Sequence, residues 1–278
     1  MSNFPTMNRK LPPILLLVTI VLFSSCVEHA YYLSPFTANS NPYHAIPLAS
    51  DSVRGATYIN TSVNVGGANY NWRDNIIAFR AGLHRSNTFG NFHLYYGGNV
   101  AIGSYNVASY QNGEYGVGMD PNTINRNAGS KFFGGYGFNG GFNALVPLRS
   151  GGEWRVIGLE GSAQNEFGNY LDFRNKLPDS AANVDNREHW TGTVGITTEI
   201  ISRRRSGSTF GYKLGIGMGL NAIRNNANYT INPPTYISNT LHFGRDNWLA
   251  FCQVNFGTYT GSFQFGVNYK IGARKINH

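Results

Sequence analysis

Apolar and polar residues alternate with a period of two along most of the chain after residue 56. The clearest stretch runs from Phe210 to Ala222, where seven apolar residues alternate with Gly, Lys and Asn. Successive side chains of a β-strand point to opposite faces, so this pattern predicts a strand with one apolar and one polar face. Helical periodicity is absent from the same part of the chain.

Similar alternation predicts nine strands. They cover residues 57–65, 76–85, 92–103, 132–146, 155–167, 190–200, 210–222, 248–258 and 262–271. Because single-chain bacterial barrels have an even number of strands, either one of the nine is false or a tenth lies in the connecting loops.

The connections between these strands indicate the topology. Short turns are predicted at 86–90, 149–153, 203–208 and 259–261, and long polar loops at 105–130, 175–189 and 224–246. Short turns at one end and long loops at the other are typical of antiparallel hairpins that close into a barrel. The predicted fold is therefore an all-β, antiparallel, up-and-down barrel of about 8 to 10 strands.

Composition bears on which face of the barrel is outside. Charged residues make up 13% of the chain, which is too few to cover a soluble surface comfortably, and 34 residues are glycine. The polar face consists mainly of Gly, Asn, Thr and Ser, as expected for a narrow, hydrogen-bonded lumen. We therefore expect the apolar face to meet lipid. A soluble, lipid-tethered, lipocalin-like barrel that binds a small hydrophobic ligand is the alternative.

Four tryptophans lie at predicted strand ends. Trp72, Trp190 and Trp248 occur where predicted long loops become strands, and Trp154 follows a short turn. Tryptophan is enriched at both membrane–water interfaces, so these residues are candidates for an interfacial aromatic belt.

The N-terminal region has the features of an export signal. A basic pair, Arg9 and Lys10, precedes an apolar run at 14–23 that is too short for a membrane-spanning helix, and small residues follow it. The stretch LFSSC, which ends at Cys26, resembles the lipobox of bacterial lipoproteins, although Phe23 replaces the usual leucine. The resemblance implies that Cys26 is acylated and becomes the mature N-terminus. A plain secretory signal is the alternative.

This reading divides the chain into three parts. Residues 1–25 form a lipoprotein signal peptide, 26–55 a lipidated tether and 56–278 the barrel domain. The tether contains Pro35, Pro42 and Pro47 and shows no periodicity of either kind. Cys252 is the only other cysteine, so lipidation of Cys26 would leave no disulfide partner.

Several ionisable residues share the polar face and are expected in the lumen. They are Arg80, His84, His93, Glu160, Glu166, Glu199, Lys213 and Lys270. Because an unpaired buried charge is costly, we expect ion pairs, in particular one between Glu199 and Lys213 on strands joined by the turn at 203–208.

His84 and His93 are the weak candidates for a metal site. A turn centred on residues 88 and 89 would place them directly opposite each other, about 5 Å apart between Cβ atoms. No Asp, Glu or Cys lies nearby in sequence to complete a ligand set. We therefore expect two hydrogen-bonded lumen histidines, no bound metal and no cofactor beyond the acyl group on Cys26.

The combination of signal, cysteine and barrel resembles the lipoprotein β-barrels of Bacteroidota outer membranes. The resemblance implies a lipid-anchored, outer-membrane protein that contacts membrane lipid and other envelope proteins. The chain contains no catalytic motif such as GxSxG or HExxH and no nucleic-acid-binding motif, although its formal charge is +8. We expect a noncatalytic structural or accessory subunit, with the soluble ligand-binding barrel second and a lipid-acting barrel hydrolase third.

Overall fold

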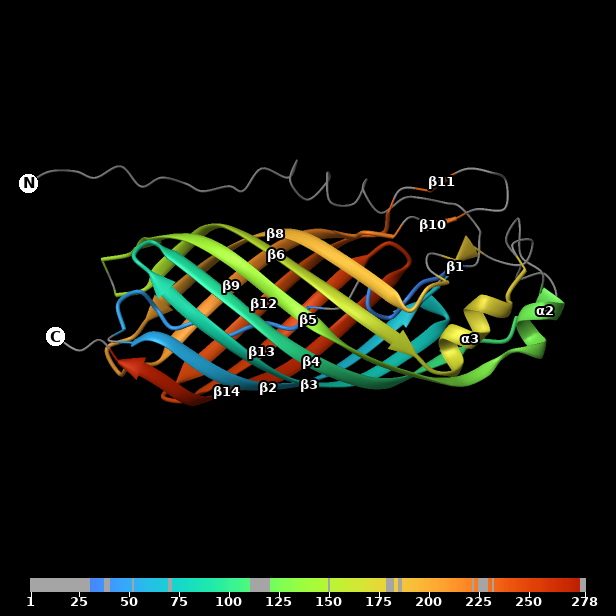
Figure 1. The fold of residues 1–278 in the computed structure, drawn as a ribbon, viewed down its shortest axis with the longest axis horizontal. Helices are drawn as coiled ribbons and strands as arrows, with labels where there is room; N and C mark the ends of the chain where they lie inside the picture. Colours follow the sequence, from blue (N-terminus) through green and yellow to red (C-terminus); the bar gives the residue numbers. More distant parts are fainter. Residues whose placement is uncertain are drawn as a thin grey trace, which may run out of the picture.

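The protein is a closed ten-stranded antiparallel β-barrel (Figure 1). The computed structural model describes residues 31–37, 41–51, 53–69, 72–110, 121–149, 151–178, 183–184, 187–221, 223–224, 230–231 and 233–275. The barrel strands are β2 (Val53–Ala68), β3 (Asp74–Phe89), β4 (Phe92–Val107), β5 (Gly129–Pro147), β6 (Glu153–Phe167), β8 (Trp190–Arg203), β9 (Thr209–Gly219), β12 (Thr235–Arg245), β13 (Trp248–Gly257) and β14 (Thr260–Lys275).

Each strand pairs with the next barrel strand along the chain, and β14 pairs with β2 to close the cylinder. Connections at 90–91, 148–152, 204–208 and 246–247 lie at one end, which we call the turn end. Connections at 69–73, 108–128, 168–189, 220–234 and 258–259 lie at the other, the loop end. The all-β, up-and-down barrel predicted from the alternation is confirmed.

Among the residues that the structure describes, the secondary structure outside the barrel lies at the loop end. It consists of the helices α2 (Pro121–Arg126) and α3 (Asn169–Lys176) and the short strands β1 (Tyr31–Tyr32), β7 (Asn183–Val184), β10 (Ile223–Arg224) and β11 (Thr230–Ile231), which form a small sheet (Figure 1). In the part of the chain that the structure describes, no helix is both long and apolar enough to cross a membrane.

The tenth strand, β12, lies within the region predicted to be the long loop 224–246. Its side chains do alternate, since Ile237, Leu241 and Phe243 are exposed whereas Ser238 and Thr240 are buried. The outer face is interrupted by polar Asn239 and the inner face is mixed, so the alternation is weak in the sequence. The connections at 69–73 and 258–259 also correct the prediction, because they are short and yet lie at the loop end.

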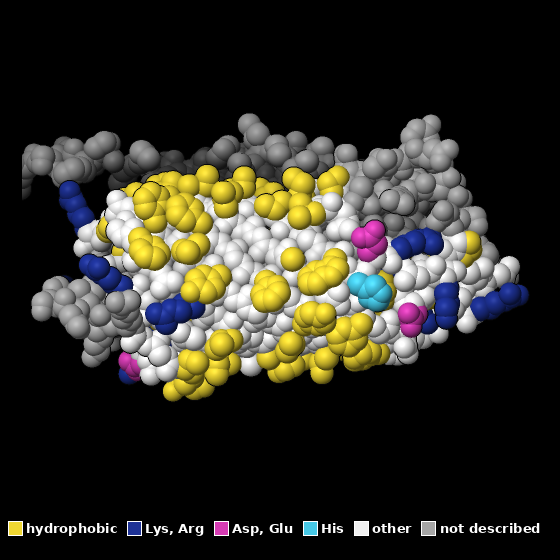
Figure 2. Space-filling view, viewed as in Figure 1, with side chains coloured by type: hydrophobic (Ala, Val, Ile, Leu, Met, Phe, Trp, Pro, Cys, Tyr) yellow, Lys and Arg dark blue, Asp and Glu magenta, His cyan; other side chains and the backbone are white. Residues whose placement is uncertain are grey.

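The apolar face points outward along the whole barrel. On β9, Phe210, Ile216 and Met218 are exposed, and Ile216 keeps 58% of its surface accessible. Hydrophobic side chains cover the middle of the wall, and most charged side chains lie towards its two ends (Figure 2). This orientation is the opposite of the soluble lipocalin-like alternative, in which the apolar face would line the lumen.

Glycines on the inner face leave room for large lumen side chains. A Cβ on Gly135 of β5 would lie 2.6 Å from the Phe36 ring, and one on Gly211 of β9 would overlap the His242 imidazole. The glycine-rich polar face is therefore the complement of a crowded interior.

That interior contains the chain's own N-terminal segment. Residues 31–37 and 41–51, apart from the partly exposed residues 41, 49 and 51 and the exposed residue 50, are buried inside the barrel or at its loop-end mouth. The described residues of the region expected to be a tether make hydrogen bonds and aromatic contacts to the inner wall. We call these described residues, 31–37 and 41–51, the plug.

Candidate functional site: the occupied lumen

The plug begins at the loop end. The ring of Tyr31 stacks on that of Tyr259, with centroids 3.6 Å apart, and its backbone N–H donates to Asn69 Oδ1 at 2.9 Å. Asn69 and Tyr259 belong to the two short connections of the loop end, and both have positive φ. These contacts fix the first described residue of the plug at the loop-end mouth.

An aromatic cluster holds the next residues. Tyr32 packs edge-on against Phe173, and Phe36 packs edge-on against Phe133. Tyr170 of α3 donates from its hydroxyl to Leu33 O at 3.0 Å. Burial raises the pKa of the Tyr170 phenol well above its usual value, against the opposing effect of Arg174, so the phenol remains a protonated donor at neutral pH. Helix α3, in the connection between β6 and β8, thus packs against the plug and hydrogen-bonds it.

Polar contacts continue where the plug enters the barrel. Ser34 Oγ donates to Glu166 Oε2 at 2.6 Å, and Arg174 of α3 pairs with the same carboxylate oxygen at 2.6 Å. Deeper in the lumen, Gln253 donates to the carbonyl of Asn41 at 3.1 Å.

The centre of the plug is Tyr43, which hydrogen-bonds across the lumen. Its hydroxyl donates to Glu199 Oε1 at 2.7 Å, and its carbonyl accepts from Asn268 at 3.2 Å. The adjacent His44 stacks on Tyr95, with ring centroids 4.9 Å apart. These partners come from β8, β14 and β4, so the plug is bonded to opposite sides of the barrel.

Arg155 is the main cation of this region. Its side chain is 1% exposed and lies between two carboxylates, with Nε 2.7 Å from Glu153 Oε1 and Nη1 2.6 Å from Glu199 Oε2. It also donates to the plug carbonyl of Ile46 at 3.2 Å. Charge pairing and hydrogen bonding are both needed to offset the desolvation of such a group.

Two histidines extend this network. His242 Nε2 lies 2.7 Å from Glu199 Oε1, and His93 Nε2 lies 3.0 Å from Glu153 Oε1. The other oxygen of Glu153 accepts from the backbone N–H of Ala49 at 2.8 Å. The lumen carboxylates therefore bind plug and wall together.

The plug leaves the barrel at the turn end. Asp51 pairs with Arg203, the last residue of β8, at 2.8 Å, and Ser50 donates to the carbonyl of Gly151 in the β5–β6 turn at 2.8 Å. The chain then enters β2 at Val53. The plug thus runs through the lumen from the loop end to the turn end.

The predicted ion pair between Glu199 and Lys213 is not the one that forms. The register is as predicted, since Glu199 lies opposite Lys213. However, Lys213 Nζ bonds Glu160 Oε2 at 2.5 Å, and Glu199 is occupied by Arg155 and His242. Strict alternation along β6 would place Arg155 on the outer face. A β-bulge between Arg155 and Gly158 instead turns its side chain into the lumen.

The pairing of His84 with His93 is also wrong. The β3–β4 turn is centred on residues 90 and 91, so His84 lies opposite Gly97 and His93 lies opposite Thr88. His84 bonds the carbonyl of Ala45 in the plug at 2.9 Å. No cluster of three or more potential metal ligands occurs within the described ranges.

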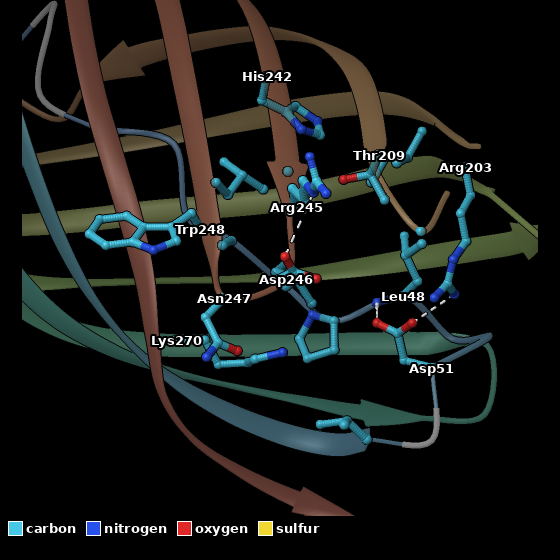
Figure 3. Close-up of a pocket in the computed structure, with 18 of the residues that line it drawn as sticks. Leu48, Asp51, Arg203, Thr209, His242, Arg245, Asp246, Asn247, Trp248 and Lys270 are labelled. Atoms are coloured by element: carbon cyan, nitrogen blue, oxygen red, sulfur yellow. Dashed lines mark hydrogen bonds and ion pairs between the residues drawn. The ribbon is translucent and has the colours of Figure 1, made fainter. Parts of the chain in front are cut away.

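The two remaining lumen candidates, Arg80 and Lys270, lie at different heights along the barrel axis. Arg80 is buried, and its guanidinium lies 5.4 Å from the centroid of the Phe36 ring. Lys270 lines a pocket of about 530 Å³ at the turn end, beside the plug. Arg203, Arg245 and Lys270 approach this pocket from three strands, and His242 lies deeper in it (Figure 3).

The tryptophans form two sets. Trp72 and Trp190 lie at the loop end, and Trp154 and Trp248 lie at the turn end; all four are exposed. Trp248 was expected after a long loop, but β12 occupies that region and the residue follows the tight turn 246–247. Cys26 lies outside the described residues.

Comparison with known proteins gives structural similarity alone. No family model and no curated protein match the chain. The chain is similar to the β domain of the Bordetella autotransporter BrkA (10% identity, 78% of this chain and 99% of that one, TM-score 0.42) and to an outer membrane channel from Pseudomonas putida F1 (12% identity, 83% and 98%, TM-score 0.39). The transport unit of the autotransporter AIDA-I from Escherichia coli is similar at 8% identity (77% and 90%, TM-score 0.39). These structural neighbours are outer-membrane β-barrel proteins.

Proposed function

We propose that this protein is a noncatalytic outer-membrane β-barrel whose lumen is permanently closed by its own N-terminal segment, and that it serves as a structural or accessory component of the envelope. The exposed apolar wall supports a membrane location, because lipid-facing and lumen-facing residues alternate in such barrels. Its partners are membrane lipid and other envelope proteins.

The observation that carries the proposal is the bonding of the plug to the wall. Tyr43, Ile46 and Ala49 each bond a member of the network formed by Glu153, Arg155 and Glu199. A hydrogen bond to a charged group contributes about 1.5–3 kcal/mol, so withdrawal of the plug, which breaks several such bonds, is strongly opposed. A lumen occupied in this way is unsuited to a general diffusion pore.

Conductance in planar lipid bilayers tests closure. The full-length barrel should show no steady ion conductance, whereas a variant that lacks residues 31–51 should conduct because its polar lumen is emptied. Heat-modifiable migration on gels should establish that both barrels are folded. Steady conductance of the full-length protein equal to that of the deletion variant would contradict the proposal.

Lipidation of Cys26 is a further part of the proposal and is supported by the LFSSC stretch. Mass spectrometry of the mature chain should show an acylated N-terminal cysteine, and Cys26→Ala should remove both the acyl mass and cleavage at this bond. A mature chain with an unmodified cysteine at position 26 would exclude the lipoprotein assignment.

A further inference from the structure

The direction of the plug has a consequence for the topology of the N-terminus. Contacts of Tyr31 fix one end of the plug at the loop end, and contacts of Asp51 fix the other at the turn end. Because β2 starts at the turn end, the chain that precedes Tyr31 is joined to the plug at the loop-end mouth.

Chain length limits where Cys26 can lie. It precedes Tyr31 by five residues, which span at most about 18 Å when fully extended. The 16 residues of β2, at about 3.3 Å each and a tilt of about 40°, rise roughly 40 Å along the barrel axis. Cys26 therefore cannot return to the turn end, either through the lumen or outside the wall.

The connections indicate which face this is. In outer-membrane barrels the short turns face the periplasm and the longer loops face the cell exterior. Here the three longest connections, 108–128, 168–189 and 220–234, are all at the loop end.

We infer that the mature N-terminus, with the acyl group of Cys26, lies at the cell surface, and that the acyl chains insert into the outer leaflet of the membrane. This inference rests on the proposed membrane function. The lipid anchor and β2 then hold the plug from opposite faces. The plug is a fixed transmembrane connection between the surface anchor and the barrel, and it does not act as a gate.

Cysteine labelling in intact cells tests the topology. In a Cys252→Ser background, single reporters are placed before the plug (His29→Cys), at the loop end (Asn127→Cys) and at the turn end (Ser206→Cys). Asn127 and Ser206 are exposed, so both should react once reached. A membrane-impermeant maleimide should label His29→Cys and Asn127→Cys in intact cells, and Ser206→Cys only after the outer membrane is permeabilised.

Each other outcome overturns a specific statement. Labelling of His29→Cys only together with Ser206→Cys would refute passage of the N-terminus through the loop end. Protection of both His29→Cys and Asn127→Cys with labelling of Ser206→Cys would refute the surface orientation. Equal labelling of all three reporters, with the folded protein in the aqueous fraction, would refute the membrane barrel itself.

Discussion

Arg155 Nη1 and Glu199 Oε2 form a buried ion pair 2.6 Å long between neighbouring strands β6 and β8, and each residue also bonds the plug. The pair therefore links strand pairing in the wall to closure of the lumen. A conventional wall contact would affect the barrel alone, whereas this one should affect both.

The first prediction concerns this pair. Glu199→Gln should lower the free energy of unfolding in detergent micelles by about 3–5 kcal/mol, because it leaves a buried cation short of a partner. Arg155→Met should cost at least as much, since both Glu153 and Glu199 then lose their guanidinium partner. The double variant should lose less unfolding free energy than the sum of the two single variants. Asp51→Asn, at the partly exposed pair with Arg203, is the control and should cost about 0–1 kcal/mol. Additive losses would show that the two residues do not interact.

Lys213 provides a second double-mutant cycle. Because its ammonium binds Glu160, Lys213→Met combined with Glu160→Gln should show coupling of about 1 kcal/mol or more, measured by urea unfolding. Lys213→Met combined with Glu199→Gln should show a smaller coupling, although these two residues face each other in the register. A larger coupling energy for Lys213 with Glu199 than for Lys213 with Glu160 would support the ion pair predicted from the sequence.

The outward face of β9 gives a depth-dependent prediction. Ile216→Arg should cost about 2–4 kcal/mol in lipid vesicles if the side chain meets the middle of the membrane. Leu220→Arg, just beyond the loop end of the same strand, is the matched control and should cost about 0–1 kcal/mol. Equal and small effects at the two positions would place the wall in water.

The inward glycines give a prediction about the plug. Gly211→Ala places a methyl group against His242 and should disturb its bond to Glu199, which we expect to cost about 1–3 kcal/mol of unfolding free energy. Gly98→Ala, on the outer face of β4, is the control: its Cβ would have only one neighbour, a carbonyl oxygen 3.6 Å away, and the variant should be nearly neutral. A neutral Gly211→Ala variant would mean that the imidazole moves away without cost.

Local sequence determined nine of the ten barrel strands and the direction that most of their side chains face. A strand places alternate residues on opposite sides whatever its neighbours are, so the pattern from Phe210 to Ala222 was sufficient to predict β9 and its exposed face. Composition favoured lipid contact, because the outer side has almost no charge.

Only the tertiary structure decided what occupies the lumen. Residues 31–37 and 41–51 have no periodicity, since a segment inside a barrel is bonded on several sides by partners such as Glu199 and Asn268 that are remote in sequence. The place of Arg155 depends on a bulge that breaks strand parity, and the partner of Lys213 depends on how long side chains reach across the lumen. Closure of the barrel is a long-range event, and the contacts that it creates inside cannot be read from any one strand.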